Sequence, residues 1–403
     1  MDFELSAEDR EFVDQFKKLC EREIEPAAAE ADENGEIPPS HFTTLGANGY
    51  LGLLHDAEYG GQGASYFQAT LAQIVLAASC GSTFFTTGAS AGLFGSPIAD
   101  YGSPDQKRRF LPDIITGKKI GALAVTEPAA GTDVSRLTCT ATETDDGFVL
   151  NGQKTYITNA PICDYALVLA RLRLKNGREP GLTHFIVDAN SPGVSRGRPM
   201  KKMGLRASPT GELFFEDVAV PAESLLGNPG QGFRITMEAF NRERLALAAY
   251  SVGVMEACFK DSRRYAKERK SFGRPIIKHQ SVAFMLADIL TKYEAAYWLL
   301  METAWLFDRI AEHRVQGGRS GRYMHNGHPI DLTARAAEIK LMASTYAREV
   351  TNLAVQIHGG AGYMEEYRVC RLYRDIKLAE IGGGTSEIQK QIIARYETKR
   401  VPA

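Results

Sequence analysis

The sequence has little net charge and no paired cysteines, and both features narrow what the protein can do. Its formal net charge is −2 over 403 residues and no long basic run is present, so nucleic acid is an unfavourable partner. The six cysteines are scattered without a C-x-x-C spacing, which favours reduced thiols in an intracellular protein over a disulfide framework or a zinc site. No H-E-x-x-H motif or clustered His/Asp spacing indicates any other metal.

Long apolar runs are also missing. A stretch such as LALAAYSVGVM is too short to span a bilayer. The first residues, MDFELSAEDREFVDQFKKLCEREI, are acidic and amphipathic, unlike a signal or transit peptide. We therefore expect a soluble, cytoplasmic protein without a membrane span, in which the first residues are part of the fold.

The sequence pattern divides the chain into a helical segment, a β-rich segment and a second helical segment. Residues 1–119 read as helices, in which Ser6 caps the first and Pro38 and Pro104 open others. Residues 120–231 contain short β-rich runs separated by turn signals, which predict a β-domain. Residues 232–403 return to long helical patterns, with helices expected at about 233–270, 280–313, 332–358 and after Ser386. Segregated strands argue against an alternating βαβ fold, and the polar segment 314–329 reads as a loop inserted between two C-terminal helices.

Three consecutive glycines, Gly382–Gly384, precede the last of these helices. Ser386 and Gln389 have the spacing of a capping box and mark its start. Glycines at such a point allow a ligand to approach bare backbone near the positive end of a helix dipole. A plain turn is the alternative.

Two β-rich motifs have the composition of a cofactor site. VTEPAAGTDV, residues 125–134, runs from a strand into a turn whose N–H groups and hydroxyls can hold a phosphate or a polar ring edge. NGQKTYITN, residues 151–159, offers Tyr156 as a stacking face and Thr158 as a donor on the same strand face. Each could equally be an ordinary hairpin with surface threonines.

Glu243 is the strongest candidate for acid–base chemistry. The residues one helical turn away from it are small or apolar: Ala239, Phe240, Ala246 and Leu247. A desolvated carboxylate has a raised pKa and accepts protons well near neutral pH. An ion pair with Arg242 or Arg244 is the alternative.

A serine hydrolase is a weaker reading. GASAG, residues 88–92, fits the G-x-S-x-G pattern, but the alternating strands and helices that should surround such a motif are missing. Small residues on a packed or pocket-lining helix are the preferred interpretation.

Five motifs together resemble the acyl-CoA dehydrogenase family: VTEPAAGTDV, NGQKTYITN, YAKERKSFGRPI, QIHGGAGYMEEYRVCRLYRDIK and GGGTSEIQKQIIAR. The resemblance runs from Leu5 to about Arg395, and the motifs follow the family's order. It implies an α+β fold with an N-terminal α-helical domain, a middle β-barrel domain and a C-terminal four-helix bundle.

The resemblance also implies an activity. Members are homotetrameric FAD enzymes, dimers of dimers, that desaturate an acyl-CoA thioester between its α and β carbons. A carboxylate takes the α-proton, the flavin N5 takes the β-hydride, and electrons leave through an electron-transfer flavoprotein. Preorganised donors must polarise the thioester carbonyl, and by position one of them is the backbone N–H of Gly383.

Further roles carry over by position. Tyr156 matches the aromatic stacking position, and Arg269, Phe272, Gln280, Gln356, Gly359 and Gly360 match contacts to the FAD of a neighbouring subunit. The other expected FAD contacts are Val125, Thr126, Thr132, Thr158, Thr385 and Glu387. The expected substrate contacts are Thr132, where a hydroxyl meets the CoA part, and Arg244, Gly383 and Gly384.

The chain departs from the commonest pattern at Gly383, where many members have the catalytic glutamate. A lineage that includes the isovaleryl-CoA and long-chain dehydrogenases carries the base at the position of Glu243, which the resemblance therefore nominates. The segment 82–97 resembles part of the acyl pocket, and its small residues favour a branched or ring-bearing acyl group. An acyl-CoA oxidase and a catalytically silent acyl-CoA-binding homologue stay open as alternatives.

Overall fold

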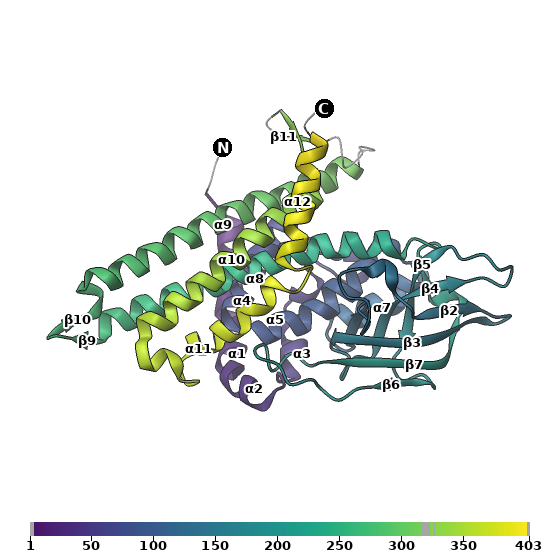
Figure 1. Ribbon diagram of the computed structural model, residues 1–403, viewed down its shortest axis with the longest axis horizontal. Helices are drawn as coiled ribbons and strands as arrows, with labels where there is room; N and C mark the ends of the chain where they lie inside the picture. Colours follow the sequence, from purple (N-terminus) through teal and green to yellow (C-terminus); the bar gives the residue numbers. More distant parts are fainter. Residues whose placement is uncertain (1–3, 316–322, 326, 401–403) are drawn as a thin grey trace.

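The computed structural model describes residues 4–315, 323–325 and 327–400. Two helical parts lie around a β-sheet that forms one end of the molecule (Figure 1). The helices before the sheet are α1 (Ala7–Glu23), α2 (Ala28–Asn34), α3 (Ser40–Ala47), α4 (Tyr66–Ser79), α5 (Gly81–Gly88), α6 (Ser96–Tyr101) and α7 (Pro104–Ile115). A wide π-helical turn, Ala89–Gly95, joins α5 to α6.

Local capping chemistry explains where two of these helices begin. The Ser6 side chain accepts a hydrogen bond from the backbone N–H of Asp9, as expected for the N-cap of α1. Ser103 and Gln106 form a reciprocal capping box in front of Pro104. The helix start predicted at Pro38 was less accurate, because α3 begins at Ser40.

The middle part is a mixed sheet. Its strands are β1 (Gly121–Ala124), β2 (Thr140–Glu143), β3 (Gly147–Thr158), β4 (Tyr165–Arg173), β5 (Gly181–Asp188), β6 (Val194–Arg196), β7 (Thr210–Pro221) and β8 (Leu225–Leu226). They pair in the order β6-β7-β3-β2-β4-β5-β8, and β1 adds to β4. β1 and β2 run parallel to β4, whereas the other pairs are antiparallel.

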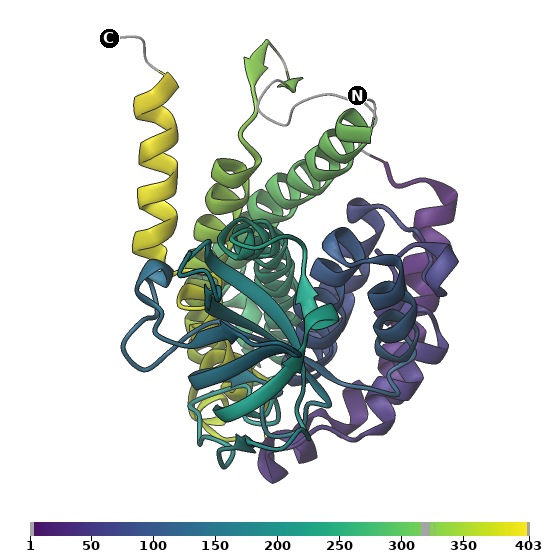
Figure 2. The same cartoon turned by 90° about the vertical axis from the view of Figure 1, so that its right-hand side faces the viewer.

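The last part is built on three long helices. They are α8 (Gly232–Glu268), α9 (Gln280–Val315) and α10 (Leu332–His358), followed by α11 (Arg368–Asp375) and α12 (Ser386–Arg400). α8 packs against α9 and α10, whereas α12 packs against α10 and stands at the edge of the molecule, away from the N-terminal helices (Figure 2). A hairpin of β9 (Lys270–Ser271) and β10 (Arg274–Pro275) joins α8 to α9.

The inserted segment 314–329 is partly described. Its described residues include a second short hairpin, β11 (Met324–His325) with β12 (His328–Pro329). Residues 316–322 and 326 of the predicted loop lie outside the described residues.

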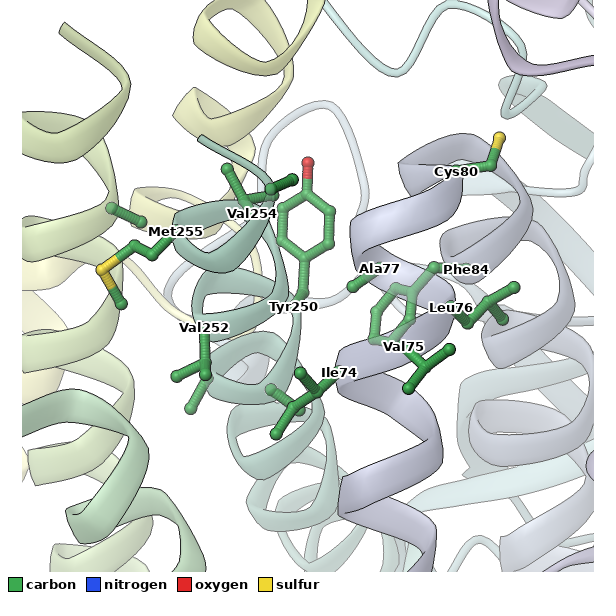
Figure 3. Packing of buried hydrophobic residues seen from close by; sticks show 14 of the residues in the cluster. Ile74, Val75, Leu76, Ala77, Cys80, Phe84, Tyr250, Val252, Val254 and Met255 are labelled. Carbon is green, nitrogen blue, oxygen red and sulfur yellow. The ribbon is translucent and has the colours of Figure 1, made fainter. Parts of the chain in front are cut away.

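One core joins the helices before and after the sheet. Side chains from α4, α5 and α8 interdigitate there, with Tyr250 between the helices (Figure 3). Helices α4 and α8 approach so closely that a Cβ atom added at Gly253 would lie 2.4 Å from the carbonyl oxygen of Ile74. This packing fixes α8, and therefore Glu243, relative to α4 and α5.

The expected fold class is confirmed: helical N- and C-terminal parts flank a sheet-rich middle part. No helix in the described part of the chain is long and apolar enough to cross a membrane. In the same residues, no group of three or more histidine, cysteine or acidic side chains is arranged to hold a metal ion.

Candidate active site

A cavity of about 1000 Å³ lies where the three parts of the chain meet. Its wall combines residues of α4 and α5, the turns after β1, the end of β3, α8 and the glycine segment before α12. Most of the residues expected to bind substrate or flavin belong to this wall: Val125, Thr126, Thr132, Tyr156, Thr158, Glu243, Arg244, Gly383, Gly384 and Thr385.

Glu243 lies on α8 with its side chain in the cavity wall. Burial raises the pKa of this carboxyl to about 7, against the opposing effect of the nearby cations Arg244 and Lys340. A carboxylate with this pKa is poised to accept a proton near neutral pH.

Gly383 lies directly beside Glu243. Its φ of +61° is a left-handed conformation that favours glycine. A Cβ atom added there would lie 2.7 Å from Cδ1 of Leu247 and 3.6 Å from Oε2 of Glu243. The carboxylate of Glu243 therefore occupies space that a side chain at position 383 would need.

The carbonyl groups of the glycine segment are held by buried side chains. Nε2 of Gln389 donates to the carbonyl oxygens of Gly383 (3.0 Å) and Gly384 (2.7 Å). Nζ of Lys340 donates to Gly384 (2.7 Å), and Nε of Arg244 donates to Gly383 at 3.3 Å. These contacts fix the peptide planes that follow Gly383 and Gly384, and hence the N–H groups of Gly384 and Thr385.

The expected capping box at Ser386 is wrong. Ser386 is the first residue of α12 rather than the residue before it, and the Gln389 side chain points to the glycine carbonyls instead. Ser386 and Gln389 have the right spacing, but the Gln389 amide bonds carbonyl oxygens five and six residues before it instead of a backbone N–H group at the helix start.

The β-wall of the cavity presents Thr126, Tyr156 and Thr158. The pairing of β3 with β7 shifts between Lys154 and Ile157, and Tyr156 has a φ of +58°. Tyr156 and Thr158 were expected to share one face of the strand because side chains alternate along it. That reason is wrong, because a bulge interrupts the strand. Both residues nevertheless line the cavity.

A buried ion pair supports this wall from behind. Nζ of Lys154 donates to Oε1 of Glu127 (2.8 Å) and to the carbonyl oxygen of Val125 (3.0 Å). Glu127 also accepts from the backbone N–H groups of Thr138 and Cys139. The pair ties β3 to the turn that carries Thr126 and Thr132.

The remaining expected FAD contacts lie elsewhere. In the described part of the chain, the cavity wall does not include Arg269, Phe272, Gln280, Gln356, Gly359, Gly360 or Glu387. The carboxylate of Glu387 accepts from the Thr385 hydroxyl and from its own backbone N–H, and these bonds lower its pKa.

The other six residues lie near the far ends of α8 and α10, where the rings of Tyr265 and His358 stack. Arg269, Phe272 and Gln280 lie between the end of α8 and the start of α9, Gln356 is in the last turn of α10, and Gly359 and Gly360 follow that helix. Figure 1 shows β9 and β10 at the end of the molecule opposite the sheet. Phe272, at the tip of that hairpin, is 94% exposed.

The hydrolase reading of residues 88–92 is excluded by their conformation. They form helical turns and not a strand-to-helix elbow, and the buried Ser90 hydroxyl accepts a hydrogen bond from the N–H of Gly121. Gly88 and Gly92 line the cavity, and a Cβ atom added at either would meet nothing within 4 Å. The preferred interpretation, small residues on a pocket-lining helix, is correct.

The residues of this site fit a flavin. Tyr156 is 70% exposed although it lines a cavity, so that a flat ring placed there would cover its face. Thr126, Thr132, Thr158 and Thr385 surround the same space with hydroxyls. A dinucleotide needs both an apolar face and such polar partners.

The sequence did not predict that the Lys340 and Gln389 side chains hold the carbonyl groups of the glycine segment. Lys340 is buried on α10 among Ala336, Ala337 and Ala343, and its pKa is lowered to about 8 by burial. The amphipathic argument that singled out Glu243 would have found it, because Lys340 is also a charge on an otherwise small and apolar helix face.

Comparison with known protein families gives matches along nearly the whole chain. Three family models match: "Acyl-CoA dehydrogenase, N-terminal domain" over residues 6–118, "middle domain" over 122–218 and "C-terminal domain" over 230–397. A probable acyl-CoA dehydrogenase of Bacillus subtilis is 37% identical, over 99% of this chain and 100% of the relative. A subunit of the caffeyl-CoA reductase–Etf complex of Acetobacterium woodii is 36% identical, over 92% of this chain and 93% of its own.

Solved structures agree with the sequence comparisons. Butyryl-CoA dehydrogenase from Megasphaera elsdenii superposes with a TM-score of 0.88 and 36% identity, covering 99% of this chain and 100% of the other. The FAD complex of PigA has a TM-score of 0.89 and 27% identity, with full coverage of both chains. Fold, site and similarity lead to one conclusion: the chain belongs to the acyl-CoA dehydrogenase family of FAD-dependent oxidoreductases.

Proposed function

We propose that the protein dehydrogenates an acyl-CoA thioester to the 2-enoyl-CoA, with Glu243 accepting the α-proton. The observation that carries this proposal is the position of the Glu243 carboxylate, in the cavity wall and beside the backbone of Gly383. The same proposal places the protein in the lineage that carries its base at the position of Glu243, as the isovaleryl-CoA and long-chain dehydrogenases do.

The glycine segment prepares the substrate for this step. An α-proton becomes acidic enough only when the thioester carbonyl is polarised, and the backbone N–H of Gly383 is our candidate donor. Gln389, Lys340 and Arg244 hold the carbonyl oxygens of Gly383 and Gly384, so the backbone that follows the donor is fixed before substrate binds. Arg244 and Gly384 complete the expected substrate contacts, with Thr132 towards the CoA part.

FAD is the group that accepts the hydride from the β-carbon when it is bound. Around its ring system we place Val125, Thr126, Tyr156 and Thr158, with Thr132, Thr385 and Glu387 towards the rest of the cofactor. Tyr156 offers the exposed ring face, and the Glu127–Lys154 pair holds the wall in place.

A neighbouring subunit supplies the other cofactor contacts in this proposal. Arg269 lies about 40 Å from Glu243 along the axis of α8, given the rise of an α-helix, which is further than one dinucleotide reaches. The residues around Arg269 therefore serve another subunit's cavity, which requires at least a dimer. The homotetramer, built as a dimer of dimers, is the assembly that the family resemblance implies.

The electron acceptor is an electron-transfer flavoprotein in this proposal. The name of the Acetobacterium relative joins it to an Etf complex. We propose the cytoplasm as the compartment, and the six cysteines, all free in the structure, are consistent with reducing conditions.

The acyl group is proposed to be branched or ring-bearing. The open space beside Gly88 and Gly92 gives room for a broad group, and the name of the Acetobacterium relative includes the caffeyl group, which contains a ring. That relative is a reductase by name, so reduction of an enoyl-CoA by the same residues is the second candidate function.

The decisive experiment is anaerobic reduction of the bound flavin by a panel of acyl-CoA thioesters. We expect Glu243→Gln to keep flavin and ligand but to lose about a thousandfold in the rate of flavin bleaching. Glu256→Gln, on the same helix but outside the cavity wall, is the matched control. Bleaching of Glu243→Gln at the wild-type rate would refute the assignment of the base, and rapid reoxidation of the reduced enzyme by air would identify an oxidase instead.

A further inference from the structure

One wall of the cavity is more polar than an alkyl chain needs. Tyr66, Thr70 and Gln73 lie at positions i, i+4 and i+7 of α4 and all line the cavity that contains Glu243. This spacing puts them on one face of the helix. The surfaces next to them are apolar, with Leu51, Leu54, Phe84 and Phe85 in the same wall.

Arg242 brings a guanidinium group to the same cavity. Its Nη2 lies 2.5 Å from Oδ2 of Asp100, and it also hydrogen-bonds the hydroxyl of Tyr66. One carboxylate and one phenol oxygen cannot use all five N–H donors of a guanidinium. The polar wall therefore combines donors from Arg242 and Gln73 with the hydroxyls of Tyr66 and Thr70.

The charges around Arg242 favour a neutral ligand over an anion. Asp100 already neutralises the guanidinium, and Glu238 is close enough to interact with it as well. His55 adds no positive charge, because burial lowers its pKa and its Nε2–H donates to the carbonyl oxygen of Ala91 at 3.1 Å. A second carboxylate on the substrate would approach an arginine whose charge is already offset by Asp100 and Glu238.

We propose that this wall selects acyl groups with a neutral oxygen, a hydroxyl or a carbonyl, at the end remote from the thioester. The inference rests on the proposed function, since it assumes that the acyl group occupies the cavity with its α-carbon at Glu243. Tyr66, Thr70, Gln73 and Arg242 are then specificity-determining residues. An acyl chain without such an oxygen would leave their polar atoms without partners, which is the source of discrimination.

The test compares three acyl-CoA series of matched lengths, with a terminal methyl, hydroxyl or carboxylate. For the wild-type holoenzyme we expect the hydroxyl series to exceed the methyl series by about tenfold in kcat/KM at the preferred length, as one or two hydrogen bonds would give. The double variant Thr70→Val, Gln73→Leu removes the polar atoms and keeps similar shapes, so the ratio of the two series should fall towards one.

Thr351→Val is the matched control, since Thr351 is a buried helical threonine outside the cavity wall. It should leave the ratio at its wild-type value. A wild-type ratio of one, a ratio unchanged in the double variant, or a preference for the carboxylate series would each overturn the proposal.

The readouts separate this inference from the proposed function. Bleaching of the flavin by any of the thioesters tests the dehydrogenase activity, whereas the ratio between the series tests the polar wall. Calorimetric dissociation constants for the same series decide the inference even if no thioester reduces the flavin. Equal affinities for the hydroxyl and methyl series would then overturn it.

Discussion

Glu243 and Gly383 are a coupled pair of positions. The carboxylate of Glu243 stands 3.6 Å from where a side chain at 383 would begin, so two carboxylates on the two segments would repel each other in a water-poor site. The left-handed φ at Gly383 and the nearby Leu247 side chain disfavour any side chain there. A carboxylate at this position of α8 is therefore compatible with a glycine, and not with a second carboxylate, before α12.

A raised pKa at Glu243 makes the folded state less stable at neutral pH. The carboxyl has a folded pKa of about 7 and an unfolded value of about 4.3. The folded protein binds more protons between these values, so the contribution of this group to stability is present at low pH and is lost as pH rises towards 7. We expect holoenzyme Glu243→Gln to be more stable than wild type by about 3 to 4 kcal/mol at pH 8, with the gain shrinking towards pH 5.

Thermal unfolding of both holoenzymes across this pH range measures the effect. Glu256→Gln again serves as the control for the removal of a carboxylate from α8. A stability difference that is independent of pH would show that Glu243 is ionised without cost in the folded protein.

At the scale of elements, local signals in the sequence predicted the long helices well. The expected ranges 280–313 and 332–358 compare with α9 at Gln280–Val315 and α10 at Leu332–His358, because caps and apolar periodicity are local properties. The bulge in β3 and the short helix α11 depend on contacts far along the chain, and no local pattern encodes them. The Gln389 amide bonds carbonyl groups only five and six residues before it, but the capping-box pattern predicted a different local partner. The division of the chain at residues 119/120 and 231/232 stays a prediction.

Lys340 links α10 to the glycine segment and lies near Glu243, the proposed base. We expect Lys340→Met to lower kcat about tenfold, because the Gly384 carbonyl loses its charged donor. Lys340 also lowers the pKa of Glu243, so the midpoint of the pH–rate profile should move upward in this variant. Lys292→Met, a lysine outside the cavity wall, is the control, and an unmoved midpoint would contradict a role for Lys340 in tuning the base.

An added side chain should have different effects at two helical glycines, Gly92 and Gly253. Gly92→Val places its methyl groups in open space beside the cavity, so the fold should survive while kcat/KM for ring-bearing thioesters falls at least tenfold relative to short straight ones. Gly253→Val would force atoms against the backbone of α4 and should destabilise the protein by about 3 kcal/mol or more. Steady-state kinetics and thermal unfolding distinguish the two, and unchanged selectivity in Gly92→Val would mean that the acyl group does not pass Gly92.

At the scale of the whole molecule, the expected cofactor contacts fall into two groups at opposite ends of α8. One group surrounds the cavity with Glu243, and the other follows Arg269 and the exposed tip at Phe272. If two subunits share each cofactor site, a subunit that lacks the base and a subunit that lacks the distal contacts can complement each other. This arrangement makes the assembly testable by activity.

We expect oligomers mixed from Glu243→Gln and Arg269→Ala subunits to regain activity that neither variant has alone. In a mixed dimer, the cavity of the Arg269→Ala subunit faces the intact distal residues of the Glu243→Gln subunit, so one of the two sites is complete. Random pairing of equal amounts then gives roughly a quarter of wild-type turnover, because about half of the dimers are mixed and each has one working site. Subunits unfolded and reassembled together are compared with the same variants reassembled separately and then combined. Activity in the mixture no higher than in the separate samples would show that each chain binds its FAD alone.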